Sequence, residues 1–451
     1  MFSKILIANR GEIALRVIRA ARELGLKTVA VYSESDRNSL HTILADEKVC
    51  IGPSRAADSY LNIPNILGAA EQTKAEAIHP GYGFLAENPR FAEICESSGI
   101  IFIGPQPAMI KLMGNKSLAR QEMRKSHLYI LPGSNEVVQD LPEAKKIAKK
   151  MGYPVILKAA AGGGGKGMRI ARTRAQLEEQ FGLAQNEAKA SFSDASLYVE
   201  KYLDNSRHIE IQVVGDKHGN VVALGERECS IQRKHQKIIE ESPSPFVDDR
   251  LRKRMIKAAE DAARRIGYQS LGTFEFLVDG QERYYFMEAN TRVQVEHPVT
   301  EMVYGVDLVK EQIRIAAGEK LSIKDDIGMI GHCLECRINA EDPVTFSPSP
   351  GTIDFMLLPG GHGIRVDSAA YQGWQIPPDY DSLVAKVIAL APTRPEAIRK
   401  MQTALEMTTI VGIKTNLPLH LAILADSDFA KGSYDTQFME RFQQKNGNNH
   451  K

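Results

Sequence analysis

Long hydrophobic runs are missing from this chain of 451 residues, and no stretch approaches the roughly 18 apolar residues of a membrane-spanning helix. An excess of one charge is missing as well, since 57 basic and 56 acidic residues give a net charge of +1. No overall field therefore favours nucleic acid or a membrane surface, and we expect neither as a partner. An anionic ligand must be held by locally arranged charge.

Cysteine is scarce, and its five residues are scattered and odd in number, which indicates reduced thiols instead of a disulfide framework. Cys333 and Cys336 form one Cys-x-x-Cys pair, which would also suit a metal or redox site. Because residues 332–339 form a predicted strand, on which positions three apart face opposite sides, we interpret them as ordinary strand cysteines. Lys4 and Arg10 interrupt the N-terminal segment, so we predict no secretory signal and a cytoplasmic protein.

The remaining composition, with 43% hydrophobic and 25% charged residues, is that of a globular protein of about three domains. Strands alternate with helices over the first hundred residues, beginning with an apolar run at 4–8 and helical spacing at 11–24. This rhythm predicts a parallel sheet covered by helices, within an α/β (α+β) fold. Further helices are predicted at 112–127, 250–266, 394–407 and 417–425.

A glycine-rich loop follows the strand predicted at 155–159 and reads Gly-Gly-Gly-Gly-Lys-Gly from residue 162 to residue 167. Four consecutive glycines cost conformational entropy, which is reasonable where backbone N–H groups approach phosphate oxygens. Lys158 and Lys166 add positive charge on either side. The pattern is neither GxxxxGK[ST] nor an initial GxGxxG, which disfavours Walker-type and dinucleotide-binding folds. The alternative is a mobile surface hairpin without a ligand.

Polar side chains recur at every second position between residues 285 and 298. In an extended chain the following side chains share one face: Glu288, Asn290, Arg292, Gln294 and Glu296. Glu288 and Asn290, with Glu275 on the preceding predicted strand, offer oxygen ligands suited to Mg²⁺ beside ATP. An exposed edge strand also alternates, although it usually favours lysine, glutamate and threonine.

The second half of this face predicts chemistry on a small anion. Arg292 and Gln294 are donors that suit a planar anion, and Glu296 lies next along the face as a possible general base. Two other charged groups are less specific. The charge at 226–237, where His235 and Lys237 share one strand face, is by itself typical of a solvated surface. Arg337 is an isolated strand arginine for which a structural salt bridge is equally consistent.

Together these motifs resemble the biotin carboxylases of the ATP-grasp superfamily over essentially the whole chain. The glycine loop and the Glu288-Ala-Asn290 strand are shared with carbamoyl phosphate synthetase, whereas the segments 79–88, 286–298 and 335–342 are more specific. The resemblance implies an N-terminal biotin carboxylase domain, an ATP-grasp domain with a mobile glycine-rich lid at about 131–203, and a C-terminal biotin carboxylase domain. The implied boundaries are 1–114, 115–330 and 331–447.

The resemblance also implies roles for matching residues. The implied ATP-binding residues are Lys116, Lys158, Gly163, Gly164, Gly165, Met168, Glu200, Lys201, Leu203, His208, Gln232, His235, Glu275, Leu277 and Glu288. The implied Mg²⁺ (or Mn²⁺) ligands are Glu275, Glu288 and Asn290, and the implied bicarbonate site is Lys237, Arg292, Gln294 and Val295. The implied catalytic residues are Arg292, Lys237, Glu296 as base and Arg337 as the group that steadies the biotin enolate. Tyr82 and Arg337 are the implied biotin-binding residues.

A biotin-attachment motif such as Ala-Met-Lys-Met is not found, so we expect the biotin on a separate biotin carboxyl carrier protein, with carboxyltransferase subunits in a larger complex. Family members of this kind are commonly homodimers, and Arg19 and Arg365 resemble dimer-surface positions. Acetyl-CoA carboxylase, in fatty acid biosynthesis, is the expected setting, and a two-subunit pyruvate or other acyl-CoA carboxylase is the alternative. Asn115 and Thr436 depart from the common pattern near the nucleotide, where they could alter affinity.

Two other functions are compatible with parts of this sequence. A carbamoyl phosphate synthetase fragment would belong to a chain with a second synthetase half, for which 451 residues leave no room. A regulatory nucleotide-binding protein that has lost catalysis usually loses its metal ligands or base. The residues concerned are all present here: Glu275, Glu288, Asn290, Arg292 and Glu296.

Overall fold

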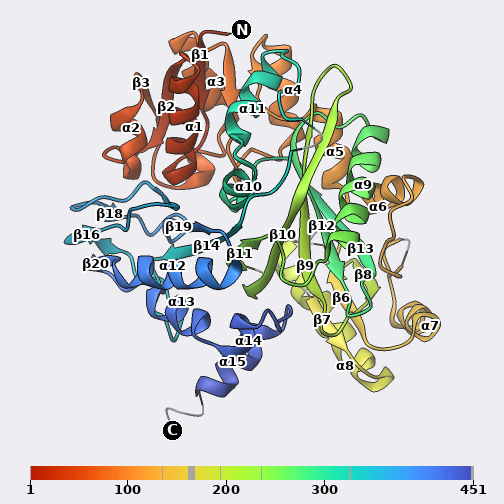
Figure 1. The fold of residues 1–451 in the computed structure, drawn as a ribbon. Helices are drawn as coiled ribbons and strands as arrows, with labels where there is room; N and C mark the ends of the chain where they lie inside the picture. The colour runs from red at the N-terminus through yellow and green to blue at the C-terminus, as the bar shows by residue number, and fades with distance from the viewer. Residues whose placement is uncertain are drawn as a thin grey trace.

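The computed structural model describes residues 2–134, 136–160, 168–192, 194–234, 236–324 and 327–447. The chain forms a parallel sheet near its N-terminus, a small sheet of three strands, and one large sheet that extends into its C-terminal part (Figure 1). This arrangement confirms the predicted α/β class. Within the described ranges, none of the helices has the length and apolar character needed to cross a membrane.

The first sheet is parallel throughout, with the strand order β3-β2-β1-β4-β5. Its strands are β1 (Lys4–Ile7), β2 (Lys27–Ser33), β3 (Glu47–Gly52), β4 (Ala77–His79) and β5 (Ile101–Phe102). The helices along this part of the chain are α1 (Gly11–Glu23), α2 (Leu40–Leu44), α3 (Ile63–Thr73) and α4 (Pro89–Ser97). The pairing confirms the predicted parallel sheet. Parallel strands need crossover connections, and helices lie in these connections.

The helix predicted at 112–127 is wrong as a single element, because the chain forms α5 (Pro107–Gly114) and α6 (Lys116–Lys125). The break lies at Asn115, whose backbone is extended and whose side chain accepts a hydrogen bond from the N–H of Leu118 at 3.0 Å. An asparagine that satisfies a free N–H of the first turn favours a new helix start over continuation. Asn115 therefore has a structural role as the cap of α6.

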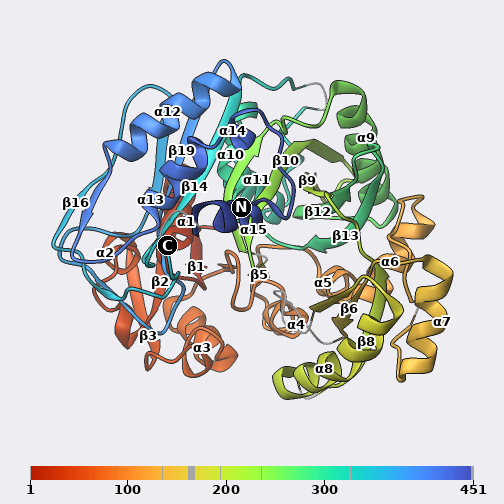
Figure 2. The same ribbon diagram turned by 90° about the horizontal axis from the view of Figure 1, so that it is seen from below.

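A small antiparallel sheet has the order β7-β6-β8 and lies at one end of the molecule in both views (Figure 2). Its elements are α7 (Leu141–Met151), β6 (Val155–Ala159), β7 (Met168–Ala171), α8 (Arg174–Phe192) and β8 (Leu197–Lys201). The predicted strand at 155–159 is confirmed. The glycine loop, including Gly163, Gly164 and Gly165, lies outside the described residues.

The large sheet has the order β13-β12-β9-β10-β11-β14-β19-β17 and its neighbouring strands are antiparallel. Its strands are β9 (Arg207–Gly215), β10 (Val221–Arg233), β11 (Gln236–Ser242), β12 (Ser270–Val278), β13 (Tyr284–Asn290), β14 (His332–Asn339), β17 (Ile364–Ser368) and β19 (Leu383–Ala391). Helices α9 (Asp249–Arg265), α10 (His297–Tyr304) and α11 (Leu308–Ala316) lie along its central part. The pairing of β11 with β14 makes the central and C-terminal parts of the chain one continuous sheet.

Two short strand pairs and four helices complete the C-terminal part. The pairs are β15 (Gly351–Thr352) with β18 (Gln375–Ile376), and β16 (Phe355–Leu357) with β20 (Thr409–Val411). The helices are α12 (Arg394–Glu406), α13 (Leu417–Leu424), α14 (Ser427–Ala430) and α15 (Phe438–Gly447). The predicted helices at 394–407 and 417–425 are confirmed to within one residue at their C-terminal ends.

The cysteine pair on β14 shows that this strand is covered on both faces. Cys333 packs in the core that joins α1, α10 and α11 to the large sheet, and Cys336 packs in the core beneath α12 and α13. The two side chains therefore face opposite sides of the sheet. All five cysteines are free thiols, and four of them are buried. The interpretation of Cys333 and Cys336 as strand residues without a shared metal is consistent with this geometry.

Candidate active site

One cleft of about 2360 Å³ is lined by residues from the N-terminal, central and C-terminal parts of the chain. Every predicted site residue within the described ranges lines it. These residues are Tyr82, Lys116, Lys158, Met168, Glu200, Lys201, Leu203, His208, Gln232, Lys237, Glu275, Leu277, Glu288, Asn290, Arg292, Gln294, Val295, Glu296 and Arg337. His235 lies outside the described residues. The sequence-predicted set is thus brought together in one place, although its members come from distant segments.

The expectation that residues 285–298 form one extended face is wrong beyond residue 290. Strand β13 ends at Asn290, residues 291–296 form turns and irregular backbone, and α10 begins at His297. Pro298 at the first turn of α10 favours the helix start that follows this irregular segment. The side chains of Arg292, Gln294 and Glu296 nevertheless face the cleft, held there by contacts made across it.

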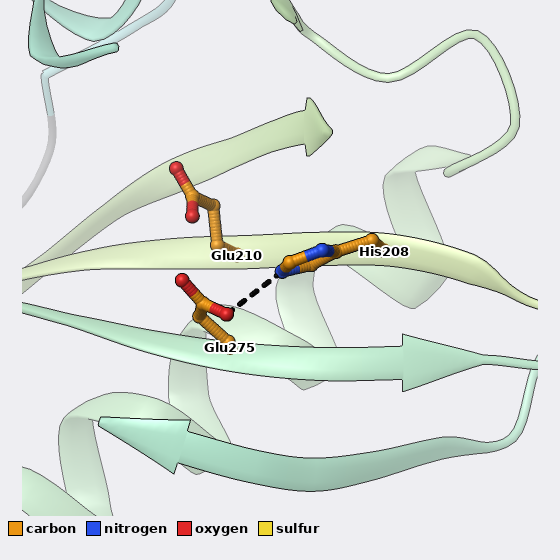
Figure 3. Close-up of side chains that lie close together, drawn as sticks. All are labelled: His208, Glu210 and Glu275. Atoms are coloured by element: carbon orange, nitrogen blue, oxygen red, sulfur yellow. Dashed lines mark hydrogen bonds and ion pairs between the residues drawn. The ribbon is translucent and has the colours of Figure 1, made fainter. Parts of the chain in front are cut away.

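Glu275 is the carboxylate around which the donors of this cleft gather. It lies directly opposite Glu288 across the β12–β13 pair. Its Oε2 lies 2.9 Å from His208 Nε2 (Figure 3), and its Oε1 accepts a hydrogen bond from Asn290 Nδ2 at 2.8 Å. Burial opposes its charge, but the cation of Lys237 and the ring of His208 hold the pKa of Glu275 well below its usual range.

Lys237 on β11 is the cation that joins three buried carboxylates. Its Nζ contacts Glu296, lies 2.6 Å from Glu210 Oε2 and lies 3.3 Å from Glu275 Oε1. Burial opposes its charge, yet these neighbours raise the pKa of Lys237 well above its ordinary value. The lysine is therefore a fixed cation in the part of the cleft predicted to hold bicarbonate.

Glu296 lies between two cations. Besides Lys237, Arg337 on β14 reaches it, with Nη2 at 2.8 Å from Glu296 Oε2, and the same guanidinium donates from Nε to Glu240 Oε1 at 2.6 Å. Burial opposes the charge of Glu296, but the two cations hold its pKa well below the ordinary value of a carboxyl. Glu296 is therefore an ionised carboxylate that faces the cleft.

Arg292 is oriented by contacts on each side of its guanidinium. Its Nε donates to Glu87 Oε2 at 2.8 Å, its Nη1 to Gln294 Oε1 at 2.7 Å, and its Nη2 to Asn290 Oδ1 at 3.0 Å. Glu87 also accepts the backbone N–H of Thr291 at 2.8 Å, which fixes the turn after β13. The first parallel-sheet segment therefore positions an arginine of the central segment. Glu87 lies within the motif at 79–88, but no local pattern distinguished it.

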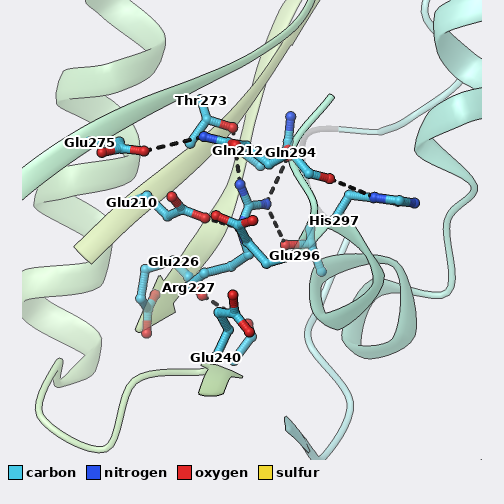
Figure 4. A network of polar contacts seen from close by, with 12 residues as sticks. Glu210, Gln212, Glu226, Arg227, Glu240, Thr273, Glu275, Gln294, Glu296 and His297 are labelled. Carbon is cyan, nitrogen blue, oxygen red and sulfur yellow. Dashed lines mark hydrogen bonds and ion pairs between the residues drawn. The ribbon is translucent and has the colours of Figure 1, made fainter. Parts of the chain in front are cut away.

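The interpretation of the charge at 226–237 as a solvated face is wrong for its first half. Arg227 is fully buried and lies at the centre of a polar network (Figure 4). It contacts Glu210 and donates to Gln212, Thr273 and Thr300 at 2.7, 3.0 and 2.9 Å. A run of charge can be buried in this way when neighbouring strands supply a partner for each donor.

Glu210 is a second residue that no sequence motif singled out. It lies between His208 and Gln212 on β9, so the three alternate positions face the same side, and Figure 3 shows His208 and Glu210 together. Glu210 connects Lys237 to Arg227 and is fully buried. The period-two polar pattern within 207–215 was the available signal.

On the nucleotide side, Glu200 is bound to Lys158 at 2.6 Å and contacts Arg120, a residue that was not predicted. Burial opposes its charge, but Lys158 and Arg120 lower the pKa of Glu200 to about 2. Lys116 Nζ lies 3.8 Å from Glu288 Oε2, at the opposite wall. Each of the two lysines predicted to bind phosphate therefore pairs with a carboxylate at the cleft. A bound phosphate could replace that carboxylate as the partner of the lysine.

Similarity to known families and proteins covers almost the entire chain. Residues 1–110 match the family described as biotin carboxylase, N-terminal domain, residues 115–324 match carbamoyl-phosphate synthase L chain, ATP binding domain, and residues 335–441 match biotin carboxylase C-terminal domain. A biotin carboxylase of Haemophilus influenzae is 55% identical over 443 residues, which are 98% of this chain and 99% of that protein. A pyruvate carboxylase subunit from Methanothermobacter thermautotrophicus is 52% identical over 444 residues, 98% of this chain and 90% of the relative.

Solved structures agree with the sequence relatives. The biotin carboxylase–β,γ-ATP complex of Campylobacter jejuni aligns with a TM-score of 0.95 at 48% identity, over 98% of this chain and 99% of the other. The biotin carboxylase domain dimer of Hydrogenobacter thermophilus 2-oxoglutarate carboxylase, solved with MgADP, ADP and bicarbonate, aligns with a TM-score of 0.94 at 51% identity, over 98% of both chains. On this sequence and fold, the chain belongs to the biotin carboxylase family of ATP-grasp ligases.

Proposed function

We propose that this chain uses ATP and bicarbonate to carboxylate biotin on a separate carrier protein, releasing ADP and phosphate. The observation that carries the proposal is the position of Glu296, an anionic carboxylate held between Lys237 and Arg337 in the large cleft. The two cations that stabilise Glu296 would also attract a small anion to it and lower the pKa of that anion, which favours proton transfer. The relatives support the same activity, since they include biotin carboxylases and a structure with MgADP and bicarbonate.

Bicarbonate is proposed to bind beside Arg292, Gln294, Lys237 and the backbone of Val295. Arg292 presents a planar guanidinium whose orientation is fixed by Glu87, which suits the planar anion. Lys237 adds a buried positive charge within reach of Glu296. Together they neutralise the anion while Glu296 takes its proton.

ATP is proposed to lie along the wall formed by β6, β8 and the end of β13. Lys116 and Lys158 would contact the phosphates, with Met168, Glu200, Lys201 and Leu203 around the base and ribose. The proposed assignments also include His208, Gln232, Leu277 and, outside the described residues, Gly163, Gly164, Gly165 and His235. Lys158 would exchange its contact with Glu200 for a phosphate oxygen, and Arg120 would remain as the partner of Glu200.

The donor set at the end of β13 fits a Mg²⁺ (or Mn²⁺) ion. Glu275 and Glu288 face each other across two strands, and the amide of Asn290 lies 2.8 Å from Glu275. These are the hard oxygen ligands that Mg²⁺ prefers when it also binds phosphates. When bound, the ion neutralises charge on the phosphates of ATP. The trio of His208, Glu210 and Glu275 is a poorer site, because both of its carboxylates pair with Lys237 and Glu210 also pairs with Arg227.

The proposed reaction has two stages. Glu296 accepts the proton of bicarbonate, and a bicarbonate oxygen attacks the γ-phosphorus, breaking its bond to ADP and forming carboxyphosphate. Cleavage of the C–O bond of carboxyphosphate releases CO₂ and phosphate beside biotin. That phosphate takes the N1′ proton of biotin, and N1′ attacks CO₂. Water must be kept out because it would hydrolyse the intermediate.

Arg337 and Tyr82 are proposed to serve the biotin side. Arg337 is held at two of its nitrogens by Glu240 and Glu296, so its charge is fixed where the enolate oxygen of biotin would develop. Tyr82 faces the same cleft from the N-terminal part of the chain. Burial and the carboxylate of Glu12 raise the pKa of Tyr82 well above its usual value, so its hydroxyl stays protonated.

The wider setting follows from the proposed activity. We propose that the chain works as a homodimer with a biotin carboxyl carrier protein and carboxyltransferase subunits, in the cytoplasm, with the domain boundaries 1–114, 115–330 and 331–447. Arg19 is half exposed and suits a dimer contact, whereas Arg365 is mostly buried by Asp367 and Glu301 of its own chain. Acetyl-CoA carboxylase, in fatty acid biosynthesis, is the proposed setting. The pyruvate and 2-oxoglutarate carboxylase relatives favour a keto-acid carboxylase as the second candidate.

The activity is tested by measuring ADP release with Mg²⁺-ATP and bicarbonate, with and without free biotin. We expect biotin to raise the bicarbonate-dependent rate well above its background. A rate that ignores biotin but needs bicarbonate would contradict the assignment of Tyr82 and Arg337. Ammonia-dependent turnover without a response to biotin would instead indicate carbamoyl phosphate synthetase chemistry.

A further inference from the structure

Lys386 is a fully buried lysine on β19 that no motif in the sequence singled out. It lies directly opposite Arg337 across the β14–β19 pair, so the two side chains are neighbours on one face of the sheet. Burial opposes its charge, but the carboxylates of Glu12, Glu335 and Asp367 raise the pKa of Lys386 above its ordinary value. A permanent cation is therefore buried beside the proposed biotin-binding arginine.

The contacts of this amine connect the two halves of the proposed reaction. Its Nζ donates to the backbone carbonyl oxygen of Val295 at 2.8 Å, between the proposed anion ligand Gln294 and the proposed base Glu296. The same Nζ lies 3.2 Å from Glu12 Oε1. That carboxylate oxygen accepts the hydroxyl hydrogen of Tyr82.

Asp367 does not explain why a lysine is needed here. It lies 3.8 Å from the amine and is already bound by Arg365, at 3.0 Å from Nε and 2.6 Å from Nη2. Well-packed apolar residues often stabilise a protein as well as a buried ion pair does. The partners that lie within 3.2 Å of the Lys386 amine are the Val295 carbonyl and Glu12, both of which border the cleft.

We infer that Lys386 is a positioning residue, which holds the Val295 turn and, through Glu12, the Tyr82 hydroxyl in one fixed arrangement around Arg337. The inference rests on the proposed function and adds a residue to it. Glu12 lies on α1, Val295 lies in the turn before α10, and Lys386 lies on β19. The amine of Lys386 therefore connects the N-terminal, central and C-terminal parts of the chain at the proposed reaction site. Such a tie matters because small displacements of reacting groups cost large factors in rate.

The test compares Lys386→Met with Lys400→Met in the full chain. Lys400 is the matched control, because its Nζ also donates to a backbone carbonyl of β19, that of Leu390 at 2.7 Å, on the side away from the cleft. ADP release is measured while ATP, bicarbonate and biotin are varied in turn. We expect Lys386→Met to raise the KM for bicarbonate and lower the biotin-stimulated kcat, each on the order of tenfold or more, with the KM for ATP unchanged. Lys400→Met should match the wild-type chain.

Two further variants separate positioning from folding. Glu12→Gln/Lys386→Met removes both buried charges, so it keeps the charge balance, and its KM for bicarbonate should stay raised. Glu12→Gln alone keeps the bond from Lys386 to Val295 and should affect the KM for biotin only. A folded Lys386→Met or double variant with a wild-type KM for bicarbonate would overturn the inference. Absence of biotin-stimulated turnover in the wild-type chain would instead overturn the proposed function.

Discussion

Arg337 and Glu296 share an ion pair in which Nη2 lies 2.8 Å from Oε2, so the proposed biotin group and the proposed base are in direct contact. Each keeps a second partner when the pair opens, Glu240 for Arg337 and Lys237 for Glu296. The pair can therefore separate to admit a substrate without leaving either charge buried alone. This arrangement makes the roles of the two residues separable by mutation.

Replacing Glu296 by glutamine keeps the shape of the side chain but removes its ability to accept a proton. We expect Glu296→Gln to fold, because Lys237 retains Glu210 and Glu275 as partners. Bicarbonate-dependent ADP release should fall by a factor on the order of 100 to 10,000. ATP affinity, measured by titration calorimetry, should be unchanged. Normal turnover of the variant would remove Glu296 from the proposed role.

Arg337→Met should abolish the response to biotin while bicarbonate-dependent ATP cleavage without biotin continues. The variant lacks the cation proposed to stabilise the enolate oxygen of biotin. ATP cleavage continues because Arg337 is not a proposed ligand of ATP. Burial raises the pKa of Glu240 to about 7 despite its contact with Arg337, so the loss of this cation would further favour the neutral acid. Arg337→Met/Glu240→Gln is the matched control for that effect. Retention of full biotin stimulation in both variants would contradict the assignment.

The Arg227 network should contribute strongly to stability. Arg227→Met leaves Glu210 without one of its two cations in a fully buried place, and we expect a loss of about 3–5 kcal/mol. Lys257→Met is the control, because its pair with Asp261 on α9 is exposed and should contribute less than about 1 kcal/mol. Chemical denaturation followed by circular dichroism measures both. Equal losses of unfolding free energy in the two variants would mean that the buried network contributes no more to stability than an exposed ion pair.

Acid should destabilise the protein in part through its buried neutral histidines. Burial lowers the pKa of His420 to about 4, although its Nε2 lies 2.7 Å from the carbonyl oxygen of Arg337. The unfolded chain binds this proton near pH 6.5 and the folded chain does not, so stability is full above that pH. It then falls as pH drops toward 4, by on the order of 3 kcal/mol for this residue.

The measurement is the unfolding free energy of His420→Gln and of the wild-type chain between pH 7.5 and 4. The variant should show a shallower decline, since glutamine has no proton to gain. Its absolute stability at pH 7.5 is compared in the same series, so that a packing defect is separated from the slope. Parallel slopes would show that the two states of the chain protonate His420 alike.

Local patterns predicted the elements of the fold well where burial follows a simple period. The strands at 155–159 and 332–339 have the predicted bounds because each is a run of strand-forming residues covered on both faces. The pattern failed at Asn115 and at Asn290. Helical spacing continues through the first, but a side-chain cap starts a new helix. Alternation continues past the second, but Glu87 binds the N–H of Thr291 outside the sheet and α10 begins at His297.

The site was predicted less evenly. Glu288, Asn290 and Glu296 lie in a dense motif, whereas Glu210, Arg227 and Lys386 gain their meaning only from partners on other strands or other parts of the chain. The sequence of a charged segment does not reveal whether its side chains face water or a buried partner. The burial of Arg227 depends on Gln212, Thr273 and Thr300, which no local window contains together with it.

The backbone pairing of β11 with β14 has a consequence for how substrates enter. Four residue pairs, from Ile239 opposite Cys336 to Ser242 opposite Cys333, join the halves that carry Lys237 and Arg337. A hinge between those halves would have to break a central sheet ladder, so they behave as one frame. Substrates therefore enter a proposed site whose two sides, at Lys237 and Arg337, keep a fixed spacing.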